Sequence, residues 1–354
     1  MSPDDRLERL MPPELARYGR QMLVSGVGVA GQQSLRHAYI TLIGCGALGG
    51  ALADILVRAG IGGLRVIDRD FIELDNLQRQ TLFDEHDIAE NLPKAEAAAR
   101  KLHRINSAVA VEGIVADFNA ANAEQLCENA DLLLDGTDNL ETRFLINDVA
   151  VKHDLPWVYG ACLATEGLVL PIVPHKTPCL RCIWDEPPAP GEIPTCDTAG
   201  ILAATVHIVA GLQATEAMKL LMGRTADLLP GLTSIDAWTA RARTVNVQAA
   251  HDTGDCPCCK HGRYDFLSGQ RGSSATTLCG RDAVQLLPAE GVTVNLKSIA
   301  GRLPAHTRPR VNEFLLRFKT DDHAVTIFAD GRTIVQGTAD PAVARGVVAK
   351  YVGT

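Results

Sequence analysis

The sequence lacks any excess of positive charge. Its 34 Lys and Arg residues are outnumbered by 42 Asp and Glu residues, which gives a formal net charge of −8. No local cluster of basic side chains offsets this balance. Proteins that bind nucleic acid or anionic lipid depend on such clusters. We therefore expect no nucleic acid and no membrane among the partners of this protein.

The sequence also lacks long uninterrupted apolar runs. Residues 1–13 alternate charged and apolar side chains, whereas a secretory signal needs a continuous apolar core. The most apolar stretch, residues 199–218, contains His207, Gln213 and Glu216, which are costly inside a bilayer. These observations predict a cytoplasmic protein in which this stretch is a buried helix and His207 is a hydrogen-bonded core residue.

Cysteine, by contrast, is not scarce. The chain has 10 Cys among 354 residues, of which 46% are hydrophobic and 21% charged, as is typical of a soluble globular protein of two domains. In a cytosolic α/β protein, cysteines indicate metal binding or thiol chemistry more often than disulfides.

Apolar periodicity predicts strands that alternate with helices in the first half of the chain. The predicted strands cover residues 39–43, 64–67, 108–115 and 131–134, and the helices cover residues 47–59 and 93–105. This alternation is typical of a doubly wound α/β fold. Later strands, at residues 157–161, 167–173, 233–237 and 244–248, have short connections that fit antiparallel pairs, so we expect a Rossmann-like mixed sheet. A proline-rich connection at residues 187–194 and a helix at residues 199–222 lie between them.

The composition changes after residue 265. We divide the chain into a large domain at residues 1–265, a linker at residues 266–272 and a small α+β domain of unknown role at residues 273–354. In the small domain the pattern predicts a helix at residues 281–287, strands at residues 292–299, 312–319, 324–328 and 333–336, and a last helix from residue 340.

The run Gly44-Cys45-Gly46-Ala47-Leu48-Gly49 has G-x-G-x-x-G spacing at a predicted strand-to-helix turn. Glycines let the backbone approach a phosphate, and the helix N-terminus offers free N–H groups. Asp68 ends the next strand, where a carboxylate can accept hydrogen bonds from ribose hydroxyls. These features fit ATP or NAD, so an oxidoreductase stays open at this point.

Charged and polar residues downstream favour ATP. They are Asp70, Asn76, Arg79, Lys94, Asp138 and Asn139. Attack of a carboxylate on the α-phosphorus of ATP brings two anions together, and Arg, Lys and Mg²⁺ reduce their repulsion. Hydride transfer needs no such cations. The alternatives are solvated surface positions for Arg79 and Lys94 and a helix-capping role for Asp138.

Two C-x-x-C pairs, Cys179 with Cys182 and Cys256 with Cys259, have the spacing at which both thiolates face one tetrahedral ion. They predict a structural Zn²⁺ site that joins two distant segments. A redox dithiol is the alternative for either pair alone. Cys258, within the second pair, leaves the ligand set ambiguous.

Together with Arg17-Tyr18-Gly19-Arg20-Gln21, these motifs resemble the ThiF/MoeB/HesA family, bacterial relatives of ubiquitin-activating enzymes, over residues 15–262. The resemblance implies the ThiF/MoeB-type sheet topology, ATP and Mg²⁺. It implies that Asp68 binds the ribose, that Asp138 binds Mg²⁺, and that Arg20 reaches ATP from the second subunit of a homodimer. It also implies phosphate contacts from Gly44, Gly46, Gly49, Asn76, Arg79 and Lys94, with Asp70 and Asn139 in the same nucleotide-binding motifs.

Cys196 matches the loop cysteine that, in ThiF-like enzymes, can form a thioester or acyl persulfide with the carrier. Its position before a predicted helix favours the thiolate, whereas the neighbouring Asp197 disfavours it. An unreactive loop cysteine is the alternative.

The resemblance implies adenylation of the C-terminal glycine of a ubiquitin-like sulfur carrier ending in Gly-Gly, which leads to a carrier thiocarboxylate in thiamine or molybdopterin biosynthesis. This chain ends in Gly353-Thr354, so we expect the activating enzyme and not the carrier. The segment after residue 272 is short for a sulfur-supplying rhodanese domain, so we expect a sulfur donor in trans. Adenylation of a modified tRNA base and a non-catalytic family scaffold are the alternatives.

Overall fold

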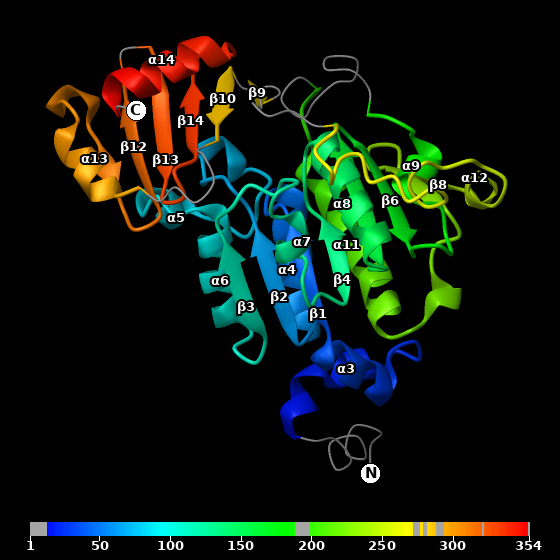
Figure 1. The fold of residues 1–354 in the computed structure, drawn as a ribbon. Helices are drawn as coiled ribbons and strands as arrows, with labels where there is room; N and C mark the ends of the chain where they lie inside the picture. Colours follow the sequence, from blue (N-terminus) through cyan, green and yellow to red (C-terminus); the bar gives the residue numbers. More distant parts are fainter. Residues whose placement is uncertain are drawn as a thin grey trace.

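The computed structural model describes residues 13–187, 199–271, 277–278, 282–287, 294–320 and 322–352, which form two β-sheets (Figure 1). The larger sheet has eight strands in the order β3-β2-β1-β4-β5-β6-β7-β8. In this order, the first five strands (β3, β2, β1, β4 and β5) pair in parallel. The remaining pairs, from β5 to β8, are antiparallel. The smaller sheet is antiparallel, in the order β11-β12-β13-β14-β10-β9. The predicted mixed α/β class with an additional small C-terminal sheet is confirmed.

The larger sheet consists of β1 (Tyr39–Ile43), β2 (Gly63–Ile67), β3 (Ala110–Ile114), β4 (Leu132–Asp135), β5 (Trp157–Leu163), β6 (Glu166–Ile172), β7 (Leu232–Asp236) and β8 (Arg241–Val245). The α-helices of this part are α2 (Gly19–Met22), α3 (Gly28–His37), α4 (Ala47–Ala59), α5 (Glu85–Ala89), α6 (Lys94–Ile105), α7 (Ala123–Leu126), α8 (Leu140–Lys152), α9 (Leu180–Ile183), α11 (Ala203–Leu221) and α12 (Gln248–Asp252). Short 3-10 helices cover Pro13–Tyr18, Leu74–Asn76 (η2) and Thr225–Asp227.

Helices cover both faces of the larger sheet because successive strand residues point to opposite sides. In β1, Leu42 packs in the cluster that includes α4, α6 and α11, whereas Ile43 packs in the cluster that includes α8. Strands β1, β2 and β4 are parallel neighbours, so their carboxyl ends meet at one edge of the sheet, away from α3 (Figure 1). In open α/β sheets, ligands bind at this edge.

The smaller sheet consists of β9 (Thr277–Leu278), β10 (Ala283–Leu286), β11 (Arg310–Val311), β12 (Leu315–Lys319), β13 (Ala324–Phe328) and β14 (Thr333–Gln336). Helices α13 (Leu296–Arg302) and α14 (Pro341–Tyr351) cover one face of it, and a 3-10 helix spans Ala305–Thr307. We call β9–β14 with α13 and α14 the C-terminal unit. The domain boundaries at residues 265 and 272 stay predictions.

Two predicted elements of the C-terminal unit are wrong. Residues 283–286, predicted as helix, form β10, and residues 296–302, predicted in part as strand, form α13. Strand β10 is buried on both faces, so its residues do not alternate between apolar and polar. Such a run cannot be told from part of a buried helix by its periodicity. Asn295 starts α13, because its side chain accepts a hydrogen bond from the Ser298 N–H group at 3.0 Å.

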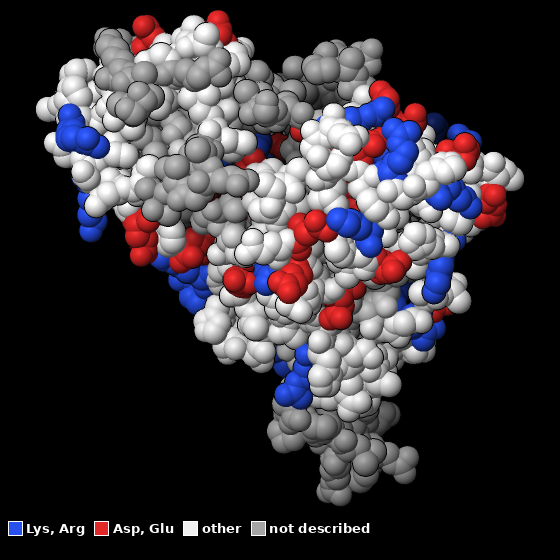
Figure 2. Space-filling model, in the orientation of Figure 1, with Lys and Arg blue, Asp and Glu red and all other residues white. Residues whose placement is uncertain are grey.

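The prediction for His207 is also wrong. Helix α11 packs on the sheet through Val206, Val209 and Ala210, which leaves His207 and Ile208 on its exposed side. None of the helices in the described ranges is both long and apolar enough to cross a bilayer. On the face drawn in Figure 2, blue and red side chains are interspersed over the residues that the structure describes.

Candidate functional site

The glycine loop after β1 makes backbone contacts that only glycine permits. Gly44 has a φ of +86°, and a Cβ on Gly49 would lie 2.0 Å from the carbonyl oxygen of Gly44. A Cβ on Gly136, just after β4, would lie 2.3 Å from the same oxygen. The loop therefore packs directly on the turn between β4 and α8. Gly46 precedes the first residue of α4 and no described side chain caps this helix, so its N–H groups are available to a phosphate.

Replacing Gly49 by alanine is expected to cost about 1–3 kcal/mol of folding free energy and to weaken ATP binding about tenfold or more. The cause is a collision with a backbone carbonyl, which cannot swing aside as a side chain can. Urea denaturation and titration calorimetry measure the two effects. Gly50→Ala is the matched control, because its Cβ would meet only the Leu82 side chain, with the Leu82 Cβ nearest at 3.4 Å. Equal losses in both variants would contradict this explanation.

Asp68 ties the glycine loop to the segment after β2. Its Oδ2 accepts a hydrogen bond from the Cys45 N–H group at 2.6 Å, and its Oδ1 accepts one from the Asp70 N–H group at 2.7 Å. Burial raises the pKa of Asp68, and the charge of Lys94 opposes this shift. Each carboxylate oxygen has a second lone pair, so Asp68 can still accept from ribose hydroxyls.

Lys94 lies next to Asp68 and Asp70. It is the first residue of α6, its side chain is 5% exposed, and its Nζ lies 3.4 Å from the Asp70 Oδ2. Its backbone N–H donates to the Asp70 carbonyl oxygen at 2.9 Å. The structure therefore brings these three predicted residues together and rejects the surface position considered for Lys94.

Asn76 and Arg79 lie on and just after η2. Asn76 is fully buried, and its Oδ1 accepts a hydrogen bond from the Glu73 N–H group at 3.3 Å. Arg79 is partly exposed, and its Nη1 donates to the Asp75 carbonyl oxygen at 2.8 Å. Both residues are anchored to the segment that also carries Asp70.

Asp138 lies in the turn between β4 and α8 with its side chain exposed. It makes no hydrogen bond to the described residues, and its charge acts on Arg69 and Arg143. The cap of α8 is Asn139, whose side chain accepts a hydrogen bond from the Thr142 N–H group at 2.8 Å. The helix-capping role considered for Asp138 is thus wrong, and the Asp138 carboxylate is open to a ligand.

A buried ion pair that the sequence did not predict shapes this turn. The Arg143 Nε donates to the Asp135 Oδ2 at 2.9 Å, and its Nη2 donates to the Thr137 and Gly160 carbonyl oxygens at 2.8 and 3.1 Å. Burial disfavours the charged guanidinium, but the Asp135 carboxylate outweighs it and raises the pKa of Arg143. Asp135 and Arg143 stand in the same stretch of sequence as Asp138, but nothing in the sequence indicates that their side chains pair.

A cavity of about 280 Å³ opens beside this turn. It lies between the carboxyl end of β3, the first turn of α8 and residues 266–271, and its polar lining includes Arg69, Asp117, Asn119 and Asn139. The cavity thus borders Asn139, the residue after Asp138, and Arg69 in the segment after β2.

Arg20 lies away from this site within the chain. Its helix α2 sits at the C-terminal end of α4, where the Gln21 Nε2 donates to the Ala59 carbonyl oxygen at 3.0 Å. The 13 residues of α4 separate this point from the glycine loop, or about 20 Å at a rise of 1.5 Å per residue. The Arg20 side chain is exposed, next to the exposed apolar residues Leu23 and Val24.

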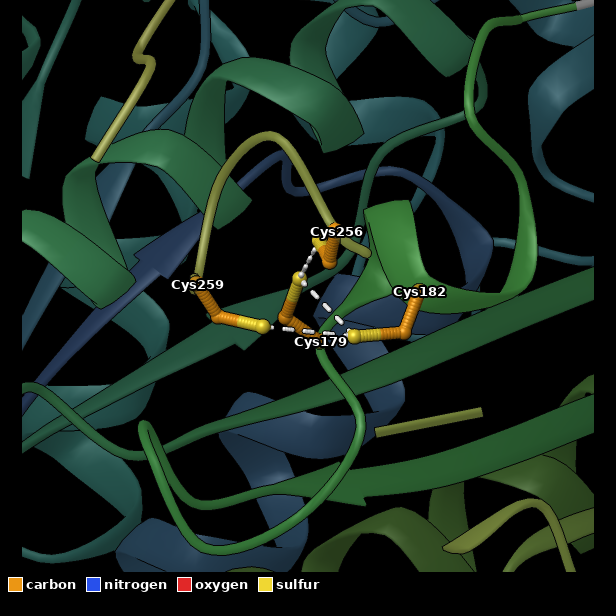
Figure 3. Close-up of side chains that lie close together, drawn as sticks. All are labelled: Cys179, Cys182, Cys256 and Cys259. Atoms are coloured by element: carbon orange, nitrogen blue, oxygen red, sulfur yellow. Dashed lines mark hydrogen bonds between the residues drawn. The ribbon is translucent and has the colours of Figure 1, made fainter. Parts of the chain in front are cut away.

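The four predicted cysteines meet in one cluster (Figure 3). Their Sγ atoms all lie within 4.8 Å of one another. The separations are 3.6 Å for Cys179 and Cys256, 3.8 Å for Cys179 and Cys182, and 3.3 Å for Cys182 and Cys259. A redox dithiol would need only two of these thiols.

Cys258 interacts with Cys179 but lies outside the group of four sulfurs. Its Sγ accepts a hydrogen bond from the Asn147 Nδ2 at 3.4 Å and donates to the Asp148 Oδ1 at 3.5 Å. Burial raises the pKa of Asp148 to about 6, although the N–H groups of Phe266 and Leu267 donate to its carboxylate. The group of four sulfurs contains Cys259 and not Cys258, and the ligand set stays a prediction.

The remaining cysteines divide into core and undescribed positions. Cys45 and Cys127 are buried, and burial raises the pKa of Cys127 to about 12, as expected for packing residues. Cys162 is partly buried against the same core. Cys196 and residues 188–194 of the proline-rich connection lie outside the described residues.

These features define a nucleotide-binding α/β protein with a four-cysteine cluster. The chain belongs to the ThiF family, whose model matches residues 18–258. It is 42% identical over 339 residues to the sulfur carrier protein ThiS adenylyltransferase of Bacillus subtilis (strain 168), a match that covers 95% of this chain and 99% of that protein. The C-terminal unit is therefore shared with this relative.

Other relatives match a smaller part of the chain. The sulfur carrier protein adenylyltransferase of Thermus thermophilus is 37% identical over 252 residues, which cover 70% of this chain and 91% of that protein. Among solved structures, E. coli MccB with MccA-N7isoASN has a TM-score of 0.61 at 24% identity and covers 70% of this chain and 75% of that one. This likeness supports the fold.

Proposed function

We propose that this protein is an ATP-dependent adenylyltransferase that activates the C-terminal glycine of a ubiquitin-like sulfur carrier ending in Gly-Gly. The observation that carries the proposal is the convergence of the glycine loop, the group of Asp68, Asp70 and Lys94, and the open carboxylate of Asp138 at one edge of the sheet. The name of the Bacillus relative, which matches over nearly its whole length, favours a ThiS-like carrier.

The reaction is a displacement at the α-phosphorus of ATP. A carboxylate oxygen of the carrier forms a bond to this phosphorus, the bond to the bridging oxygen breaks, and pyrophosphate leaves. The carrier becomes an acyl-adenylate. Lys94 and Arg79 supply positive charge that lowers the repulsion between the two anions, and the first turn of α4 supplies N–H donors.

Asp138 is suited to hold Mg²⁺. The ion prefers oxygen ligands and is commonly bound by one or two protein carboxylates together with substrate phosphates. Asp138 offers such a carboxylate without any hydrogen bond to the described residues. When bound, Mg²⁺ neutralises charge on the phosphates. The protein's part is to present Asp138 at the surface of the turn that the Asp135–Arg143 ion pair holds.

The cysteine cluster is suited to hold Zn²⁺. Four thiolates at about 2.3 Å from a tetrahedral zinc ion stand about 3.8 Å apart. Three of the Sγ pairs are 3.3, 3.6 and 3.8 Å apart, and all pairs lie within 4.8 Å. All four positions would be filled by protein, so the ion would serve to join α9 to residues 256–259.

We further propose that the protein acts as a homodimer in which Arg20 serves the site of the partner subunit. The distance between α2 and the glycine loop within the chain and the exposed apolar residues beside Arg20 support this arrangement. The carrier's later conversion to a thiocarboxylate, with sulfur from a donor protein in trans and with Cys196 as acyl acceptor, is part of the same proposal.

Exchange of radiolabelled pyrophosphate into ATP tests the function. We expect exchange only when the protein, Mg²⁺ and a carrier ending in Gly-Gly are all present. The matched control is the same carrier without its last glycine, which should give none. No exchange with any Gly-Gly carrier would contradict the proposal. Exchange with a tRNA in place of a carrier would favour adenylation of a tRNA base instead.

A further inference from the structure

The C-terminal unit has a second covered face. Within β12, Leu316 and Phe318 pack against α13 and α14, whereas Leu315 joins a cluster with Phe71, from the segment after β2. Phe328 and Ile334, from β13 and β14, belong to the same cluster. Because strand residues alternate between faces, the C-terminal sheet is covered by its own helices on one side and by residues next to the nucleotide site on the other.

Polar contacts at this second face converge on residues 69–73. The Arg332 Nη1 donates to the Arg69 carbonyl oxygen at 2.9 Å. The Arg317 Nη2 and the Gln336 Nε2 both donate to the Glu73 Oε1 at 3.4 Å. The Arg317 guanidinium also lies 4.2 Å from the centre of the Phe71 ring. The C-terminal sheet thus holds both ends and the middle of this short segment.

Arg332 is a buried cation in the contact. It is 1% exposed, and its guanidinium lies 3.8 Å from the centre of the Phe328 ring. On the other side of the segment, the Arg69 Nη1 donates to the Asp117 Oδ1 at 2.6 Å, and the Gln285 Nε2 donates to the Asp117 Oδ2 at 3.1 Å. The backbone of Arg69 is therefore held by Arg332, and its side chain is held by Asp117, which Gln285 holds in turn. Arg332 and Gln285 both belong to the C-terminal unit.

The segment held in this way carries the nucleotide site. Asp68 precedes it and Asp70 lies within it, and the Asp70 carbonyl oxygen accepts the Lys94 N–H group. Phe71 forms an isolated β-bridge with Pro93, the residue before Lys94. The Glu73 N–H group is bonded to Asn76. A shift of residues 69–73 would move all of these groups. In Figure 2, basic and acidic side chains are visible at the floor of a recess between the C-terminal unit and the rest of the molecule.

We propose that the C-terminal unit is a positioning element for ATP: Arg332, Arg317 and Gln336 hold residues 69–73 so that Asp68, Asp70 and Lys94 stand ready for the nucleotide. Arg332 and Arg317 are positioning residues that act through Arg69 and Glu73. The inference rests on the proposed adenylation, in that ATP is the nucleotide. Preorganised groups bind more tightly because less order has to be imposed on binding.

A double-mutant cycle in the full chain tests the inference. Glu73→Ala and Arg317→Ala are each expected to raise the Kd for ATP about fivefold. The double variant should also show about fivefold rather than 25-fold, because Glu73→Ala already removes the contact with Arg317, together with that of Gln336. The KM for ATP should rise in parallel, with kcat within about threefold of wild type, since these side chains do not touch the reacting atoms. Arg332→Ala should act similarly, and Arg332→Lys, which keeps a donor for the Arg69 carbonyl, should restore part of the affinity.

Lys319→Ala is the matched control. Lys319 is an exposed residue on β12, two positions from Arg317 and on the same face of the sheet, and its side chain makes no hydrogen bond to the described residues. Folded variants of Glu73 and Arg317 with wild-type Kd for ATP would overturn the inference. So would multiplicative effects in the double variant. Calorimetry with ATP needs no carrier, so a failure of carrier-dependent exchange in the wild type would count against the proposed function alone.

Discussion

Replacing Asp138 by alanine is expected to lower carrier-dependent pyrophosphate exchange by about two to three orders of magnitude. The variant would lose the open carboxylate at the carboxyl end of β4, and with it the proposed Mg²⁺ ligand beside the phosphates. The fold should be unaffected, because the side chain is exposed and the capping of α8 belongs to Asn139. Exchange rates at saturating Mg²⁺ and thermal unfolding measure both statements.

Glu128→Gln is the control for this variant. Glu128 is also an exposed acidic residue, but it precedes β4 and so lies at the opposite end of that strand. It should exchange pyrophosphate like the wild type. An Asp138→Ala protein that keeps more than about a tenth of the activity would rule out an essential metal ligand at this position.

Replacing Cys182 by serine is expected to abolish zinc binding and to lower the free energy of unfolding by about 4 kcal/mol or more. This corresponds to a fall in Tm of roughly 10 °C for a domain of this size. The cluster joins α9 to residues 256–259, so without an ion three remaining thiols would be left together in a largely buried place. Metal analysis of the purified protein should give one zinc per wild-type chain and none for the variant.

Cys258→Ser tests whether Cys258 is a zinc ligand or only a neighbour of the cluster. Cys258 lies between two proposed ligands in the sequence, but its Sγ forms hydrogen bonds with the Asn147 and Asp148 side chains. This variant should keep its zinc, whatever its stability. If Cys258→Ser lost the metal and Cys259→Ser retained it, the ligand set inferred from the Sγ separations would be wrong.

The packing of the C-terminal unit changes how the chain's organisation is understood. From the sequence, residues 273–354 form a small domain without a role. In the structure its sheet shares an apolar cluster with Phe71 and forms an ion pair with Glu73, beside the residues proposed to bind ATP. The 99% coverage of the Bacillus relative indicates that the unit is shared with that protein. Removing it would expose Phe71 and Val115 to water, so full-length variants are the better test.

The sequence by itself determined the features that depend on neighbouring residues. The G-x-G-x-x-G run from Gly44 to Gly49 and the strand ending at Asp68 predicted the doubly wound sheet, because the turn residues and apolar periods that specify these elements are local. The C-x-x-C pairs predicted the cluster, since their spacing alone lets two thiols face one point. The roles of Asp138, Lys94 and Arg20 at an ATP site are predictions of the same kind, and they stay predictions.

Only the tertiary structure decided what depends on residues far apart in the chain. It placed the Cys259 sulfur in the group of four, placed His207 on the outside of α11, and showed β10 and α13 where the pattern had suggested a helix and a strand. It also brought Arg332 to the Arg69 carbonyl oxygen across 263 positions of sequence. Such contacts produce no periodic pattern in the sequence. The burial and the partner of a side chain depend on which surfaces meet when the two sheets pack together.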